Sequence, residues 1–96
     1  MEVGIQVTGN GPLPGTEATF TSNVSSRGAR ILSTRRWRIN DRLTIATLSG
    51  SFRSVARVAY CQPEPQLSAF AVGIEFLDPK GSWVVTSPHS AALLTR

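Results

Sequence analysis

The chain has 96 residues, of which 41% are hydrophobic and 17% are charged, and its formal net charge is +4. This size and composition predict one globular domain over residues 1–96 and exclude a disordered chain or a membrane-spanning protein. The basic balance favours an anionic partner, such as a nucleotide, a nucleic acid or an acidic protein surface. With one cysteine and one histidine, the chain has no internal disulfide and no motif for a metal site. We expect a cytoplasmic protein, because we find neither a secretory signal nor an apolar run long enough for a bilayer.

Six segments have the alternation or the residue types of β-strands, and turn signals separate them. They cover residues 2–8, 16–22, 29–33, 43–48, 51–60 and 69–77. Short antiparallel connections between such strands predict an all-β fold, a six-stranded antiparallel β-barrel. The alternation places these apolar residues in its core: Val3, Ile5, Phe20, Ile31, Val58, Val72, Ile74 and Phe76.

Three further signals concern the second half of the chain. Pro63 and Pro65 predict a break after the fifth strand, because proline lacks the N–H that a sheet ladder needs. Gly73 lies on the face opposite Val72 and Ile74, which predicts a close approach or a bend. Ser87 and Pro88 predict the cap and first position of a short C-terminal helix over residues 89–95.

The stretch between the second and third strands carries the most specific functional signal. Asn23-x-Ser25-x-x-Gly28 predicts a turn, because Asn and Ser side chains bond nearby backbone and glycine tolerates unusual φ or a close approach. Such a turn can also present an amide, a hydroxyl and backbone N–H groups to an anion or a nucleobase.

This turn and the strands that follow it resemble the PilZ domain family. The turn matches the family motif (Asp/Asn)-x-Ser-x-x-Gly, and the segment that continues from Gly28 to Leu32 looks like the third strand of that family. Residues 56–60 (Ala-Arg-Val-Ala-Tyr) and 71–76 (Ala-Val-Gly-Ile-Glu-Phe) are similar to its two closing strands. Together these features extend over residues 16–78.

The resemblance implies a six-stranded β-barrel that binds the bacterial second messenger cyclic di-GMP. By the same resemblance Asn23 would bond a guanine edge, Ser25 would contact guanine or phosphate, and Gly28 would leave room for the ligand. Members of the family also wrap the ligand with an N-terminal Arg-x-x-x-Arg arm, and no such pattern occurs before Arg27 in this sequence. We therefore expect this chain to bind cyclic di-GMP weakly or not at all.

Other arginines are candidates to hold phosphate in place of that arm. Arg27 and Arg30 lie in and after the turn, and Arg35 and Arg36 open a basic segment that continues through Trp37 and Arg38. Arginine forks bind phosphate, and an indole ring can stack on a base. The alternative interpretation is a solvated basic loop whose tryptophan covers an end of the barrel.

Functions from different classes therefore stay open. The first is a non-enzymatic cyclic di-GMP sensor without cofactor or metal, joined to a protein partner or an attached effector domain. The second is a PilZ-like protein-interaction module that has lost the ligand. The third and weakest is a barrel that binds single-stranded nucleic acid through the basic segment. We expect no enzymatic activity, because no nucleophile is paired with a base.

Overall fold

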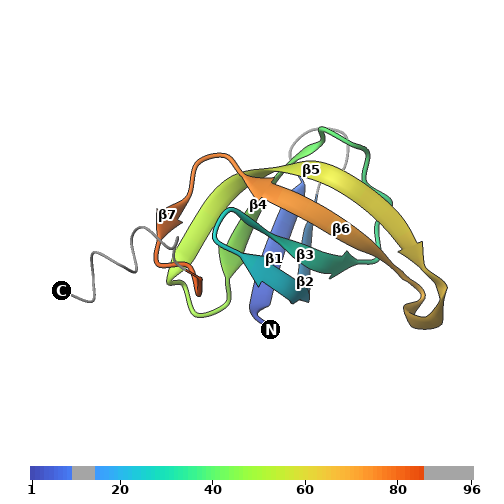
Figure 1. Ribbon diagram of the computed structural model, residues 1–96, viewed down its shortest axis with the longest axis horizontal. Helices are drawn as coiled ribbons and strands as arrows, with labels where there is room; N and C mark the ends of the chain where they lie inside the picture. Colours follow the sequence, from blue (N-terminus) through green and yellow to red (C-terminus); the bar gives the residue numbers. More distant parts are fainter. Residues whose placement is uncertain (10–14, 86–96) are drawn as a thin grey trace.

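The computed structural model describes residues 1–9 and 15–85, and its regular structure is almost entirely β. The strands are β1 (Gly4–Gly9), β2 (Thr16–Ser25), β3 (Gly28–Ser33), β4 (Arg42–Thr47), β5 (Phe52–Glu64), β6 (Ala69–Phe76) and β7 (Lys80–Gly81) (Figure 1). A 3₁₀ turn, η1 (Pro65–Leu67), joins β5 to β6. No helix in the described ranges is long and apolar enough to cross a membrane. The helix expected over residues 89–95 lies outside the described residues.

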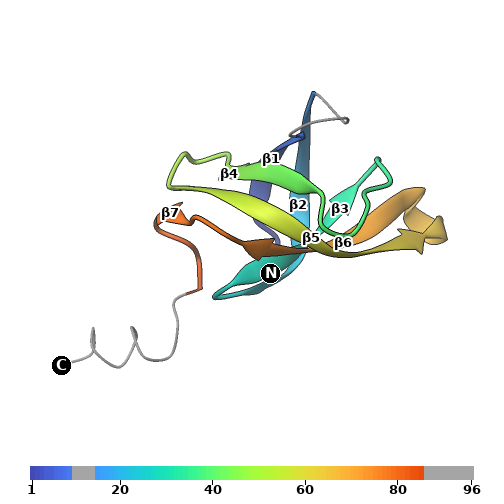
Figure 2. The ribbon, with the colours of Figure 1, turned by 90° about the horizontal axis from the view of Figure 1, so that it is seen from above.

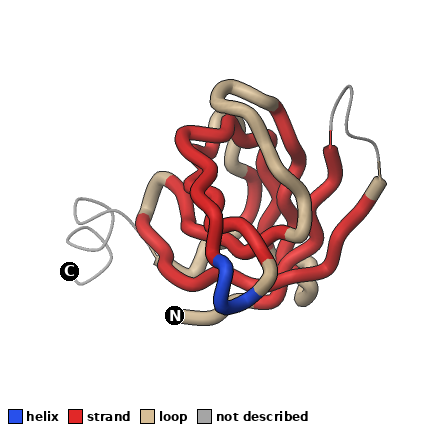
Figure 3. The backbone as a smooth tube through the Cα atoms, turned by 90° about the vertical axis from the view of Figure 1, so that its right-hand side faces the viewer, coloured by secondary structure: helices blue, strands red, loops and turns tan. Residues whose placement is uncertain are grey.

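Six of these strands close into a barrel, which confirms the predicted architecture. The strands follow the order β4-β1-β2-β3-β6-β5, and a further pairing of β4 with β5 closes the ring. Figure 3 shows the strands arranged around the barrel. All of the pairings are antiparallel. The short β7 pairs with the start of β5 and is a seventh member of the sheet.

The predicted core is confirmed at most of its positions. Ile5, Ile31, Val58, Val72 and Ile74 are buried in one cluster. Val3 and Phe76 are partly buried and pack against that cluster. These side chains point inward because successive residues of a strand face opposite sides of the sheet.

Phe20 is the exception, and its placement in the core was wrong. Its side chain is 41% exposed, because the first part of β2 turns Thr19 and Thr21 inward and Ala18 and Phe20 outward. The buried Thr21 satisfies its hydroxyl with two partners: Oγ1 donates to the carbonyl of Met1 (2.7 Å) and accepts from the N–H of Val3 (2.9 Å). Thr19 donates to the carbonyl of Leu32 (2.7 Å). On this part of β2, hydrogen bonds of inward-facing threonines hold the strand in place, whereas apolar packing has that role on the neighbouring strands.

Trp37 packs in the core, with its side chain only 3% exposed. Its Nε1–H donates to the hydroxyl of Ser33 at 3.0 Å. The same hydroxyl donates to the carboxylate of Glu17 at 2.7 Å. This placement agrees with a packing role for the tryptophan and removes its ring from any surface where a base could stack.

The fifth strand is longer than expected, because it continues through Pro63 to Glu64. β5 pairs with β4 from Arg53 to Arg57, whereas its pairing with β6 continues to its end. The proline therefore lies in a stretch that pairs with β6 alone, and proline is tolerated in a strand with one unpaired edge. Figures 1 and 2 show this end of β5 and β6 extending beyond the other strands.

Candidate functional site

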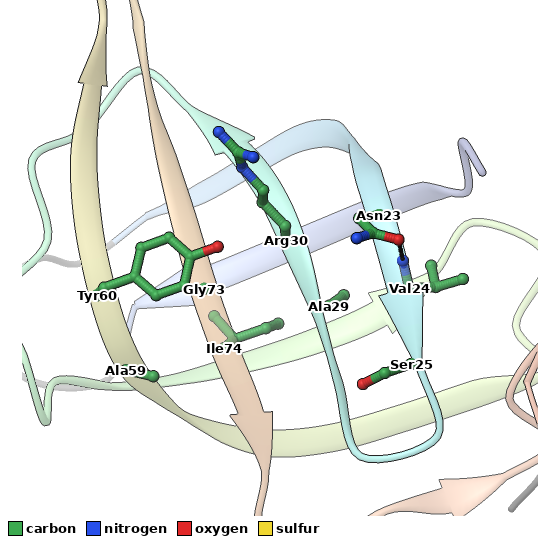
Figure 4. A pocket seen from close by; sticks show the side chains of 9 residues that line it. All are labelled: Asn23, Val24, Ser25, Ala29, Arg30, Ala59, Tyr60, Gly73 and Ile74. Carbon is green, nitrogen blue, oxygen red and sulfur yellow. Dashed lines mark hydrogen bonds between the residues drawn. The ribbon is translucent and has the colours of Figure 1, made fainter.

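A depression of about 280 Å³ lies on the outer surface of the barrel, across β2, β3, β6 and β5 (Figure 4). Its lining residues are Asn23, Val24, Ser25, Ala29, Arg30, Ala59, Tyr60, Gly73 and Ile74. Three of the residues singled out from the sequence, Asn23, Ser25 and Arg30, are therefore brought together here.

The depression is built on one row of cross-strand neighbours. Asn23 pairs with Arg30, Arg30 pairs with Gly73, and Gly73 pairs with Tyr60. Residues directly opposite each other in a sheet share a face, so all members of this row face outward. Gly73 has no side chain, and the ring of Tyr60 lies directly over it.

Asn23 and Ser25 are strand residues, so the expectation that they form the turn itself was wrong. β2 continues to Ser25 and β3 begins at Gly28, because residues 23–25 pair directly with residues 28–30. The connection is reduced to Ser26 and Arg27.

The carboxamide of Asn23 has a defined orientation. Its Oδ1 accepts a hydrogen bond from the backbone N–H of Val24 at 2.9 Å. Because a backbone N–H can only donate, the oxygen must face Val24 and the Nδ2 group points elsewhere. The Nδ2 hydrogens are thus the donors that this side chain can offer to a ligand.

The other motif residues have structural roles that the sequence did not specify. The hydroxyl of Ser25 makes a long contact of 3.4 Å to the carbonyl of Gly28, within the hairpin. Gly28 is buried, and a Cβ atom at this position would lie 2.0 Å from the backbone oxygen of Ile74. Glycine is therefore required here for the close approach of β3 to β6, and this requirement holds with or without a ligand.

Arg30 is the cation of the depression. Its Nη2 lies 3.0 Å from Oε1 of Glu64, and the two side chains are 41% and 34% exposed. Its Nε is buried and has no hydrogen-bond partner among the described residues. The guanidinium thus retains donor capacity, but a carboxylate already neutralises part of its charge.

Tyr60 was not predicted as a site residue. Its ring covers Gly73 so closely that a Cβ atom there would lie 2.1 Å from Cε2 of the ring, which confirms the close approach expected at Gly73. The residue is 36% exposed, so part of the aromatic surface faces solvent. Tyr60 is identified as a site residue by its cross-strand pairing with Gly73, and this pairing is known only once the strand register is known.

The remaining candidate arginines lie outside this depression. Arg27 is in the connection between β2 and β3, where its carbonyl accepts from the N–H of Phe76 at 2.8 Å. Nη1 of Arg35 lies 3.5 Å from the carbonyl of Gly15. Arg36 lines a second depression, which has Arg38, Tyr60 and Gln62 among its walls. Tyr60 therefore borders both depressions, with Arg30 on one side and Arg36 on the other.

No group of three histidine, cysteine or acidic side chains within residues 1–9 and 15–85 is arranged to hold a metal ion. Comparison of the chain with models of known protein families, with curated proteins and with solved structures finds no match.

Proposed function

We propose that this barrel is a non-enzymatic sensor module of the PilZ type that binds cyclic di-GMP, weakly, on its outer surface. One observation carries the proposal: the amide of Asn23, the guanidinium of Arg30 and the aromatic ring of Tyr60 belong to one cross-strand row and line the same depression. These are the groups that a guanine base and a phosphate require.

Asn23 and Tyr60 are the residues that would recognise the base. Guanine presents two acceptors, O6 and N7, on one edge, and the Nδ2 hydrogens of Asn23 are the donors available to them. The ring of Tyr60 offers a stacking surface, and stacking on an aromatic side chain contributes about 1–3 kcal/mol per base. Adenine carries an amino donor in place of O6, so the amide donors would meet another donor.

The phosphate half rests on Arg30 and explains the weak affinity. A charged hydrogen bond contributes about 1.5–3 kcal/mol and a neutral one about 0.5–1.5 kcal/mol. Arg30 has to share its charge with Glu64, so a phosphate gains less from it than from an unpaired arginine. Arg36 and Arg38, beyond Tyr60, are the further cations within the adjoining depression.

Calorimetric titration with cyclic di-GMP, at about 50 and 150 mM salt to expose the charge contribution, tests this function. We expect binding that weakens at the higher salt and is about tenfold tighter than binding of cyclic di-AMP, because adenine keeps N7 but presents a donor in place of the O6 acceptor. Arg30→Gln and Tyr60→Leu should each weaken binding by about tenfold. Arg57→Gln is the matched control, because Arg57 also forms an ion pair, with Glu75, but does not line the depression.

Two outcomes would overturn the proposal. One is the absence of cyclic di-GMP binding up to millimolar concentrations. The other is an equal loss of affinity in Arg30→Gln and Arg57→Gln, since that would trace binding to net charge alone. A protein-interaction function, the alternative expected from the sequence, is favoured by a different surface, around Phe20.

A further inference from the structure

A further hollow, a groove of about 550 Å³, opens on the barrel surface where β2 and β3 diverge. β2 pairs with β3 from Thr21 to Ser25, and with β1 from Thr16 to Phe20. The first half of β2 therefore borders the groove with the edge that faces away from β1. The lining residues are Glu2, Glu17, Ala18, Thr19, Phe20, Ser22, Leu32, Ser33, Thr34, Leu67 and Ala69.

The groove exposes apolar side chains that the fold does not use. Phe20 is 41% exposed and Leu67 is 59% exposed. The inward positions of the same strand are held by hydrogen bonds, such as those of Thr19 and Thr21. A strand that packed only for the core would bury phenylalanine and expose threonine, and this part of β2 does the opposite. Exposed apolar residues that cluster in this way mark interaction surfaces.

The charge of the groove is opposite to that of the molecule. Its lining includes Glu2 and Glu17 but no lysine or arginine, although the chain has ten of these cations. The carboxylate of Glu17 is fixed by Ser33 Oγ (2.7 Å) and by Thr34 N (2.7 Å) and Oγ1 (3.0 Å). Neither glutamate takes part in the ion pairs formed among the described residues.

We propose that this groove, named here the Phe20 groove, binds an extended segment of another protein in which apolar side chains alternate with arginine or lysine. The apolar side chains would cover Phe20 and Leu67, and a cation would pair with the rigid carboxylate of Glu17. A symmetric dimer of this chain through the groove is disfavoured, because it would place the glutamates of both copies in one interface whose lining offers no lysine or arginine. This inference is independent of nucleotide binding.

Nuclear magnetic resonance of the isotopically labelled chain, titrated with a synthetic peptide of alternating leucine and arginine, tests it. A peptide of alternating leucine and glutamate is the control. Since the chain has a net charge of +4, it repels the basic peptide overall, so tighter binding of that peptide must come from a local acidic surface. We expect the basic peptide to bind at least about tenfold tighter and to shift the resonances of the Phe20 groove.

Two variants separate this groove from the rest of the surface. Phe20→Ser should weaken the basic peptide about tenfold, as expected for an aromatic anchor. Ile39→Ser removes another exposed apolar residue, 64% exposed and outside the groove, and should leave the affinity unchanged. Should Phe20→Ser fail to fold, Leu67→Ser on the exposed η1 turn serves in its place, with the same expected loss.

Several results would overturn the proposal. These are equal binding of both peptides, no binding of either, shifts centred outside the groove, or an unchanged affinity in Phe20→Ser or, where that variant does not fold, in Leu67→Ser. A concentration-dependent dimer in sedimentation that either of these variants dissolves would also overturn it, in favour of self-association.

Discussion

Replacing Glu64 by glutamine should strengthen the binding of an anionic nucleotide, although it removes an ion pair. Oε1 of Glu64 lies 3.0 Å from Nη2 of Arg30, and both side chains are partly exposed, at 34% and 41%. Glutamine keeps the size of the side chain and an oxygen acceptor for Arg30, but it has no charge. The guanidinium should therefore keep its position and lose the carboxylate that competes with phosphate.

The size of the effect follows from two contributions. An exposed ion pair contributes about 0.2–1 kcal/mol, which the phosphate no longer has to displace. A carboxylate about 5 Å from a bound phosphate repels it by roughly 0.8 kcal/mol in a water-like dielectric. Salt screening reduces both values, so we expect a gain of about 1 kcal/mol, or roughly a fivefold lower Kd.

The assay is the same calorimetric titration with cyclic di-GMP, with Glu75→Gln as the matched control. Glu75 pairs with Arg57 at 3.3 Å and does not line the depression, and its replacement changes the net charge by the same amount. Equal strengthening by both substitutions would refute the local argument and leave only long-range charge. Weaker binding in Glu64→Gln would show that this carboxylate itself holds the ligand.

Two further predictions concern stability and are checked by urea denaturation. Gly28→Ala should lower the free energy of unfolding by at least about 2 kcal/mol, because the new Cβ would lie 2.0 Å from the backbone oxygen of Ile74. Gly50→Ala, where the Cβ meets open space at φ +80°, should cost only about 1 kcal/mol, and equal losses would contradict the steric argument. Trp37→Phe should cost about 1–3 kcal/mol, since the hydrogen bond to Ser33 is buried; an unchanged midpoint would show that water replaces it.

The sequence predicted those strands in which apolar residues alone alternate with polar ones. In β1 and β6 the apolar face could be satisfied only by facing the core, and Ile5 and Ile74 are buried as expected. In β2 the alternation also showed which residues share a face, but not which face turns inward. The answer depends on Thr21, whose hydroxyl bonds backbone groups of Met1 and Val3, 20 and 18 residues away in the chain. Contacts at that separation cannot be read from local periodicity.

The row that joins Asn23 and Arg30 to Tyr60 could not be predicted from the sequence for a related reason, because two register shifts create it. Val58 is buried, so regular alternation would also turn Tyr60 into the core. The register between β5 and β6 shifts between these two residues, which leaves Ala59 as the extra one and turns Tyr60 outward. A shift between Thr21 and Asn23 does the same on β2 and turns Asn23 outward beside Arg30.

Neither shift has a signature in the residues that form it. The extra residues, Ser22 and Ala59, are not among the described residues with positive φ, so neither required glycine or asparagine. The family motif could therefore indicate Asn23 and Ser25, while the row that joins Asn23 to Tyr60 emerged only from the register. A β-bulge changes the face of the sheet to which the following side chain points. Here two bulges turn Asn23 and Tyr60, the two ends of one cross-strand row, to the same outer face. We infer that the depression depends on these paired bulges as much as on the chemistry of its residues, because either one alone would leave an incomplete row.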